Sequence, residues 1–244
     1  AKTVSLTISE GASDNETKTN YITVNPNPTA SISGTTAVCK DAASPNITFS
    51  GSDGAPPYTF TYNINGGTSQ TVTTTVGGNV TVGVPTATAG TYTYNLLSVQ
   101  DASSSSCVQS QSGSAVVTIN PLPTATISGT TEVCRDAAAP NITFTGANGT
   151  FPYTFTYNVN GGSNQSITTT SGSSVTLDVT TGTPGTFTYN LVNVRDASTT
   201  SCVQTQTGSA VVSVNPLPTA IISGTTAVCR DAASPNITFT GANG

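Results

Sequence analysis

The chain has 244 residues, of which six are basic and eleven acidic, and it contains no His, Met or Trp. Charged residues make up only 7%, and without a Lys/Arg cluster neither a nucleic acid nor an anionic membrane is an expected partner. Because His supplies most general bases and metal ligands, no Ser-His or Cys-His nucleophile can be assembled, and neither an enzyme nor a cofactor is expected. No apolar run approaches the roughly 18 residues that a membrane span requires.

One stretch occurs three times, starting at Pro26, Pro121 and Pro216, with a constant period of 95 residues. A period of this size indicates whole domains in tandem rather than a solenoid of small units. We therefore expect full repeats at residues 26–120 and 121–215, and the opening strands of a truncated third repeat at 216–244. Residues 1–25 alternate as strand, loop and strand, and they resemble the last two strands of a preceding PKD-type domain.

Each repeat shows short alternating runs with a turn signal about every ten residues, which predicts an all-β sandwich. In the second repeat we expect strands at residues 124–129, 132–135, 141–146, 153–160, 165–169, 174–180, 186–194 and 202–214.

The clearest strand places Tyr153, Phe155 and Tyr157 on one face, as period-2 alternation requires. These aromatic residues are expected to build the core, and a sugar-stacking platform is the weaker alternative. Asn160-Gly161 follows directly and predicts a tight hairpin turn.

The last strand of each unit runs directly into a Pro-x-Pro segment that opens the next repeat, and this segment constrains the backbone to an extended form. Stiff linkers predict that the domains form a rod, with the two leucines packing as interdomain wedges. An SH3-type ligand is the less favoured interpretation. The linker residues are Pro26, Pro28, Pro121, Leu122, Pro123, Pro216, Leu217 and Pro218.

Five cysteines allow two pairing schemes. Within a repeat, Cys39–Cys107 and Cys134–Cys202 would each span 68 residues and leave Cys229 unpaired. Across junctions, Cys107–Cys134 and Cys202–Cys229 would pair, but Cys39 would then need a cysteine at position 12, which is Ala12. The repeat arithmetic favours the first scheme. Zinc is disfavoured because the chain has no Cys-x-x-Cys pair and no His, and persistent disulfides predict an extracellular location.

Two aspartates recur beside the cysteines, as Asp41 with Asp101 and as Asp136 with Asp196. Carboxylates with loop carbonyls are calcium ligands, so each pair is a weak candidate for Ca²⁺. The plainer interpretation is that they satisfy turn backbones or pair with Lys40 and Arg135. No other metal site is expected.

The run Gly185-Thr-Phe187-Thr-Tyr189 and its counterpart Gly90-Thr-Tyr92-Thr-Tyr94 resemble the Gly-x-Tyr-x-Cys segment of immunoglobulin domains. Tyr replaces the second Cys of that family, so the usual disulfide between the sheets is absent. A tyrosine corner is expected only at Tyr92, because Phe187 has no hydroxyl group.

Together, the motifs Ile-Ser-Gly-Thr-Thr, Pro-Tyr-Thr-Phe-Thr-Tyr-Asn and Gly-Ser-Ala-Val-Val resemble the Ig-like or PKD-like repeats of giant secreted adhesins of Bacteroidetes-type bacteria, including gliding adhesins. The resemblance implies a stalk or adhesion segment of a cell-surface filament, without catalysis. Neighbouring repeats, surface glycans or other cells are the implied partners. The alternatives are a carbohydrate-binding array of a secreted enzyme and a polymer assembled by strand complementation.

Overall fold

A computed structural model describes residues 2–9, 13–22 and 24–242. Part of the predicted first segment, including Ala12, lies outside these residues. The chain divides into two units, Ala1–Asn120 and Pro121–Gly244. Each unit contains one full repeat. In the described part of the chain, no helix has the length and hydropathy of a membrane span.

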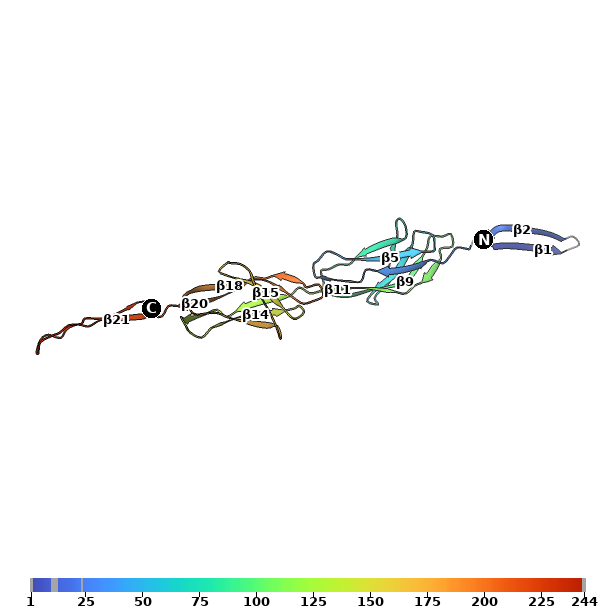
Figure 1. The fold of residues 1–244 in the computed structure, drawn as a ribbon. Helices are drawn as coiled ribbons and strands as arrows, with labels where there is room; N and C mark the ends of the chain where they lie inside the picture. The colour runs from blue at the N-terminus through green and yellow to red at the C-terminus, as the bar shows by residue number, and fades with distance from the viewer. Residues whose placement is uncertain (1, 10–12, 23, 243–244) are drawn as a thin grey trace. The chain divides into compact units, whose positions relative to one another are not determined.

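The first repeat is a sandwich of two sheets (Figure 1). The smaller sheet has the antiparallel order β3 (Thr29–Ser33), β5 (Asn46–Ser52) and β8 (Asn79–Gly83). The larger sheet has the order β4 (Thr36–Cys39), β11 (Ser114–Asn120), β9 (Gly90–Gln100), β6 (Thr59–Ile64) and β7 (Gln70–Thr73), with β10 (Val108–Ser110) paired to β9. Strand β4 runs parallel to β11, and the other pairs of this sheet are antiparallel.

The second repeat has the same topology. Its smaller sheet contains β12 (Thr124–Ser128), β14 (Asn141–Ala147) and β17 (Ser174–Asp178). Its larger sheet contains β13 (Thr131–Cys134), β20 (Ser209–Asn215), β18 (Gly185–Arg195), β15 (Thr154–Val159) and β16 (Gln165–Thr168), with β19 (Val203–Thr205) paired to β18. The predicted fold class, all-β with tandem Ig-like sandwiches, is confirmed.

Aromatic side chains between the sheets form the core of each repeat, as the alternating pattern predicted. Phe144 and Phe155 are fully buried and stack with ring centroids 5.6 Å apart. The equivalent pair in the first repeat, Phe49 and Phe60, has the same separation of 5.6 Å. The other members of the predicted aromatic strands are also buried, namely Tyr58, Tyr62, Tyr153 and Tyr157.

Burial also affects the ionisation of four core tyrosines. Desolvation raises the pKa of Tyr62 and Tyr157 above the ordinary value of 10.0. It raises the pKa of Tyr94 and Tyr189 too, with a further contribution from neighbouring tyrosine hydroxyls. Each of these hydroxyl groups therefore loses its proton at a higher pH than an exposed tyrosine does.

Two local predictions are confirmed at turns. Asn160 and Gly161 have φ angles of 52° and 72°, and Gly162 N–H donates to the Val159 carbonyl at 2.9 Å. Positive φ at both central residues is the pattern of the tight type I′ hairpin. Tyr92 also forms the expected tyrosine corner, since its hydroxyl donates to the Thr88 carbonyl at 3.1 Å.

The prediction of one continuous strand over residues 202–214 is wrong. The structure has β19 and β20 instead, separated by a segment in which Gly208 has a φ of 136°. Strand β19 pairs with the end of β18, at Arg195, while β20 pairs with its beginning, at Gly185. Three residue steps of β18, from Asn193 to Asn190, lie opposite four steps from Thr205 to Ser209, so the strand breaks where one extra residue shifts the register.

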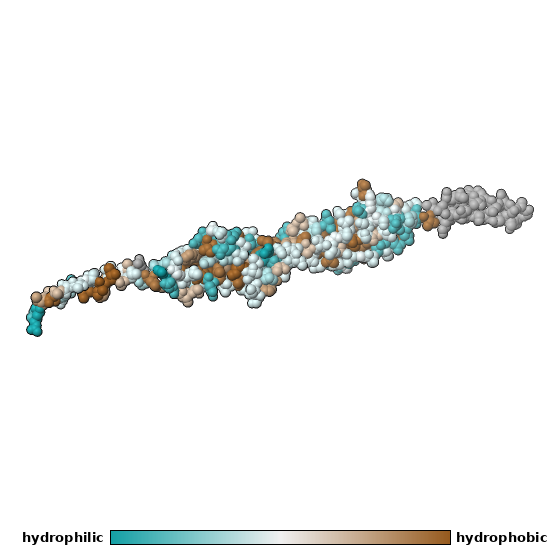
Figure 2. Space-filling model, viewed as in Figure 1, coloured by the Kyte–Doolittle hydropathy of each residue, from teal (hydrophilic) through white to brown (hydrophobic). Residues whose placement is uncertain are grey.

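Strand pairs also lie outside the full repeats. Strands β1 (Lys2–Ser9) and β2 (Ser13–Ile22) are antiparallel, and so are β21 (Thr219–Ser223) and β22 (Thr238–Ala242). The second pair keeps the register of β12 with β14, but its apolar residues are exposed (Figure 2). Phe239 is 76% exposed, whereas its equivalents Phe49 and Phe144 are both 0% exposed.

Candidate functional site

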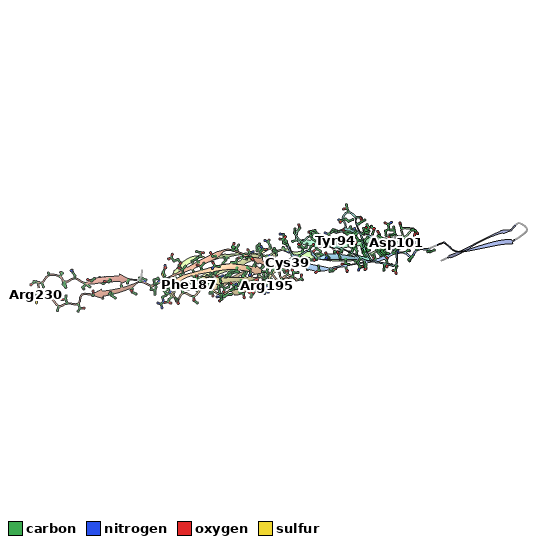
Figure 3. The ribbon with its side chains drawn as sticks, turned by 90° about the horizontal axis from the view of Figure 1, so that it is seen from above. Cys39, Tyr94, Asp101, Phe187, Arg195 and Arg230 are labelled. Atoms are coloured by element: carbon green, nitrogen blue, oxygen red, sulfur yellow. The ribbon has the colours of Figure 1, made fainter. Side chains whose placement is uncertain are left out.

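The recurring cysteines and aspartates lie at two opposite ends of each sandwich. The upstream pole of the first repeat contains Pro28, Gly54 and the loop from Asp101 to Cys107, and its downstream pole contains Cys39 to Ala42 and Asn120. Strand β9 connects the poles, because Gly90 pairs with Ile119 and Gln100 pairs with Val108. Figure 3 shows Cys39 and Asp101 at opposite ends of this repeat, with Tyr94 between them.

Asp101 organises the loop at the upstream pole. One carboxylate oxygen, Oδ1, accepts hydrogen bonds from Ser103 Oγ and from Cys107 N–H, both at 2.8 Å. The other, Oδ2, accepts from Ala55 N–H at 3.2 Å. Burial opposes ionisation, but the hydrogen bonds from Ser103, Ala55 and Cys107 outweigh it and hold the pKa of the Asp101 carboxyl below its ordinary value of 3.8. The carboxylate therefore fixes the position of Cys107.

The second repeat builds the same loop around Asp196. Its carboxylate accepts hydrogen bonds from Ser198 Oγ at 2.8 Å and from Thr150 N–H at 3.0 Å. Asp196 N–H donates to the Cys202 carbonyl at 3.0 Å, which closes the loop.

A glycine makes the close packing at this pole possible. A Cβ atom on Gly54 would lie 2.8 Å from Asp101 Cβ, and one on Gly149 would lie 2.8 Å from Asp196 Cβ. The same position on Gly149 is 2.9 Å from Cβ of the linker residue Pro123. The role of these glycines did not emerge from the sequence, although their recurrence 95 residues apart was the available signal.

The downstream pole is held mainly by backbone hydrogen bonds. Lys40 N–H donates to the Asn120 carbonyl at 2.8 Å, and Asp41, with a φ of 61°, donates its N–H to the Thr86 carbonyl at 3.0 Å. The Asp41 carboxylate forms an exposed ion pair with Lys40 Nζ at 2.9 Å. In the second repeat Arg135 Nε lies 3.4 Å from Asp136 Oδ2. The plainer interpretation of these aspartates therefore fits the structure.

The candidate calcium pairs are not brought together within a repeat. Asp41 lies at the downstream pole and Asp101 at the upstream pole, and Asp136 and Asp196 are separated in the same way. The ten residue steps of β9 between the poles correspond to roughly 33 Å. No group of three or more acidic, Cys or His residues that could hold a metal occurs among the residues that the structure describes.

The same separation corrects the predicted disulfides. Cys39 pairs in register with Asn120 at the downstream pole, whereas Cys107 lies at the upstream pole beside Val108. A disulfide needs Cα atoms within about 7 Å, so Cys39–Cys107 and, by the same topology, Cys134–Cys202 are not formed. Cys107, Cys134 and Cys229 carry free thiols, while Cys39 and Cys202 are in the disulfide form.

The linker prolines differ in their surroundings. Pro28 and Pro123 are buried, whereas Pro26, Pro121, Pro216 and Pro218 are exposed. Leu122 is half-buried and Leu217 is exposed. The second proline of each full repeat is therefore part of its upstream pole, and the role of the leucines as interdomain wedges stays a prediction.

No protein-family model matches the chain, and no curated protein matches it. Solved structures with a similar arrangement of strands include a Ca²⁺-stabilised adhesin with which an Antarctic bacterium binds ice, at 16% identity and a TM-score of 0.47 over 91% of this chain and 59% of that one. They also include a 1.5-MDa bacterial ice-binding adhesin, at 16% identity and a TM-score of 0.43 over 87% of this chain and 74% of that one. A two-domain fibronectin type III segment of chicken tenascin matches at 14% identity and a TM-score of 0.31, over 78% of this chain and 99% of that one.

This chain thus spans 59% of the length of the first of these structures. Likenesses of this strength concern the arrangement of strands and carry no argument about what the chain binds.

Proposed function

We propose that the chain is a structural stalk segment of a long extracellular surface protein. The observation that carries this proposal is the contact-for-contact duplication of the repeats. Tyr58 Oη and Tyr153 Oη both donate to a glycine carbonyl at 2.8 Å. Tyr62 and Tyr157 both contact a glutamine at 3.1 Å. Copying a domain with its core and both poles intact adds length while leaving the local chemistry unchanged.

Small-angle scattering of the whole chain tests this proposal. At about 3.3 Å per residue, the longest strands of the full repeats, which have 11 residues, make each repeat roughly 35–45 Å long. A stalk requires the two repeats to lie end to end, so the maximum dimension should be at least about twice that length. A profile fitted by two sandwiches folded against each other would refute the stalk.

The cellular setting is a second part of the proposal. A protein that contains a disulfide belongs in an oxidising compartment or outside the cell, and the resemblance in sequence favours the surface of a bacterium of the Bacteroidetes type, with a gliding adhesin as the finer assignment. Antibodies raised against a full repeat should label intact cells that produce the protein. Labelling only after lysis would place the repeats inside the cell.

The two alternatives differ in their support. A carbohydrate-binding array needs exposed aromatic residues, but the aromatic strands are buried in both cores, so a glycan array is expected to give no binder. In strand complementation, β21 and β22 would complete a sandwich with strands of another copy. Strand complementation can be tested by comparing the mass in solution of residues 1–215 with that of the whole chain. If it occurs, the whole chain should associate and the shorter form should stay monomeric.

A further inference from the structure

We propose that Asn148 is a site of spontaneous deamidation in the folded second repeat, where its side-chain amide is converted to a carboxylate. Asparagine followed by glycine is the reactive dipeptide for this chemistry, because glycine has no Cβ to hinder attack of its backbone nitrogen on the preceding side chain. The chain has such pairs at Asn65, Asn148, Asn160 and Asn243, the last of which lies outside the residues that the structure describes. This inference does not depend on the stalk function, because it rests on contacts within a single repeat.

The reaction consumes only water. Gly149 N loses its proton to solvent and attacks Asn148 Cγ, so that a new N–Cγ bond forms. The Cγ–Nδ2 bond breaks, and the amide nitrogen takes up a proton and leaves as ammonia. Water then opens the cyclic imide: cleavage of the new N–Cγ bond gives aspartate, and cleavage of the original peptide bond gives isoaspartate. Either product changes the net charge from −5 to −6 (−5 − 1).

In the hairpin turn at Asn160, hydrogen bonds hold both reacting groups. Asn160 Oδ1 accepts from Thr188 N–H at 2.7 Å, and its Nδ2 donates to the Thr186 carbonyl at 3.2 Å. The nucleophile of this pair, Gly161 N–H, donates to Asn158 Oδ1 at 3.1 Å. The equivalent turn of the first repeat has the same three hydrogen bonds. All three must break before the glycine nitrogen can reach Cγ.

Asn148 is held less firmly. It is exposed in a bend directly after β14, and its Nδ2 donates to Thr124 Oγ1 at 3.1 Å. Gly149 N–H donates to Tyr153 Oη at 3.2 Å. Within the described part of the chain, two hydrogen bonds thus restrain the reacting groups here, against three in each turn. One hydrogen bond fewer corresponds to a reaction roughly 2–12 times faster.

The first repeat shows that the aspartate product fits this loop. Asp53 occupies the position equivalent to Asn148 (148 − 95). The two residues have φ angles of 65° and 61°. Thr29, the equivalent of Thr124, donates its Oγ1 to Asp53 Oδ2 at 2.7 Å. Conversion of Asn148 to aspartate therefore only reverses the direction of one hydrogen bond.

The isoaspartate product does not fit in the same way, because it inserts an extra carbon atom into the main chain before Gly149. A Cβ atom on Gly149 would already lie 2.8 Å from Asp196 Cβ and 2.9 Å from Pro123 Cβ. The backbone at Gly149 thus has little room to shift. We expect the aspartate form to keep the stability of the second repeat and the isoaspartate form to lower it.

Peptide mapping of the whole chain tests the site. One sample is incubated folded in mildly alkaline buffer, and the other is reduced and unfolded in urea at the same pH. Tryptic peptide 136–195 contains Asn148 and Asn160, peptide 41–135 contains Asn65, and fragment spectra locate the modified residue. The ratio of the unfolded rate to the folded rate gives the protection of each pair.

Protection should be roughly 2–12-fold smaller at Asn148 than at Asn160 and Asn65, because one hydrogen bond fewer has to break. Equal protection at all three pairs, or greater protection at Asn148, would overturn the proposal.

Two variants test the restraint on the side chain. Thr124→Ala removes the hydroxyl group that holds Asn148, so it should speed deamidation of Asn148 in the folded chain roughly 2–12-fold and leave Asn160 unchanged. Thr124→Ser keeps a hydroxyl group and should react at the wild-type rate. An unchanged rate in Thr124→Ala, or equal acceleration at Asn160, would overturn the role of this contact.

Calorimetry separates the two products. Asn148→Asp should melt like the wild-type chain, as the contact of Asp53 indicates. Aged chains that carry isoaspartate at residue 148, identified by enzymatic methylation of isoaspartate, should show a lower transition for the second repeat. A lowered transition in Asn148→Asp, or an unchanged one in the isoaspartate form, would contradict the argument from the packing of this loop.

Discussion

Phe144 and Phe239 are equivalent residues of successive copies, and replacing each by alanine should have opposite outcomes. Phe144 is fully buried, with ring centroids 5.6 Å from Phe155 and 5.1 Å from Tyr157, whereas Phe239 is 76% exposed. Removing a buried phenylalanine ring costs about 3–5 kcal/mol through lost burial and the remaining cavity. A substitution at an exposed position usually changes stability by no more than about 0.5 kcal/mol.

Calorimetry of the whole chain can separate these effects, because the two repeats have separate cores. For a domain of this size, 1 kcal/mol shifts the melting temperature by about 4–8 °C. Phe144→Ala should therefore lower the transition of the second repeat by roughly 12–40 °C and leave that of the first unchanged. Phe49→Ala should do the converse.

Phe239→Ala is the matched control and should leave both transitions within a few degrees of wild type. If Phe144→Ala melts like wild type, or if Phe239→Ala destabilises the chain as strongly, the assignment of separate and complete cores to the two full repeats is refuted.

Three further predictions concern single positions. Gly129→Ala should lower the melting temperature of the second repeat more than Gly161→Ala; the left-handed φ of 72° at Gly161 costs an alanine about 1–2 kcal/mol, whereas at Gly129, with a φ of 114°, a Cβ would also clash with the backbone carbonyl oxygen of Asn141. Because the pKa of Asp101 is lowered on folding, its stabilising effect is complete above the unfolded value and is lost as the pH falls through the folded value. Acid titration should therefore show that Asp101→Asn weakens the pH dependence of the first repeat below about pH 4; an unchanged profile would contradict this. Tyr92→Phe removes the 3.1 Å hydrogen bond to the Thr88 carbonyl and should cost the first repeat about 0.5–1.5 kcal/mol in denaturant titrations; no loss would show that the tyrosine corner is not stabilising.

The fold class was predictable because its signals are local and recur. Alternation of Tyr153, Phe155 and Tyr157 requires one buried strand face, and Asn160-Gly161 supplies the positive φ angles that join this strand to the next. The same signals occur 95 residues earlier, so two copies support the same interpretation. The break at Gly208 was not predictable in the same way, because alternation continues on both sides of it and the extra residue that shifts the register shows only in the pairing with β18.

The polar residues of the poles were identified by recurrence, but their partners were not. Spacing alone could not show that Asp101 holds the Cys107 loop through Ser103 and Ala55, since Ala55 comes from a different part of the chain. It could not separate Asp41 from Asp101 either, because sequence distance does not say at which end of a strand a loop lies.

Cysteine pairing follows from the same physical point. In a sandwich, a strand of eleven residues carries the chain from one pole to the other, so the number of strand crossings between two cysteines determines whether they meet. Cys39 and Cys107 end at different poles, and no choice of loop conformation brings them within the reach of a disulfide.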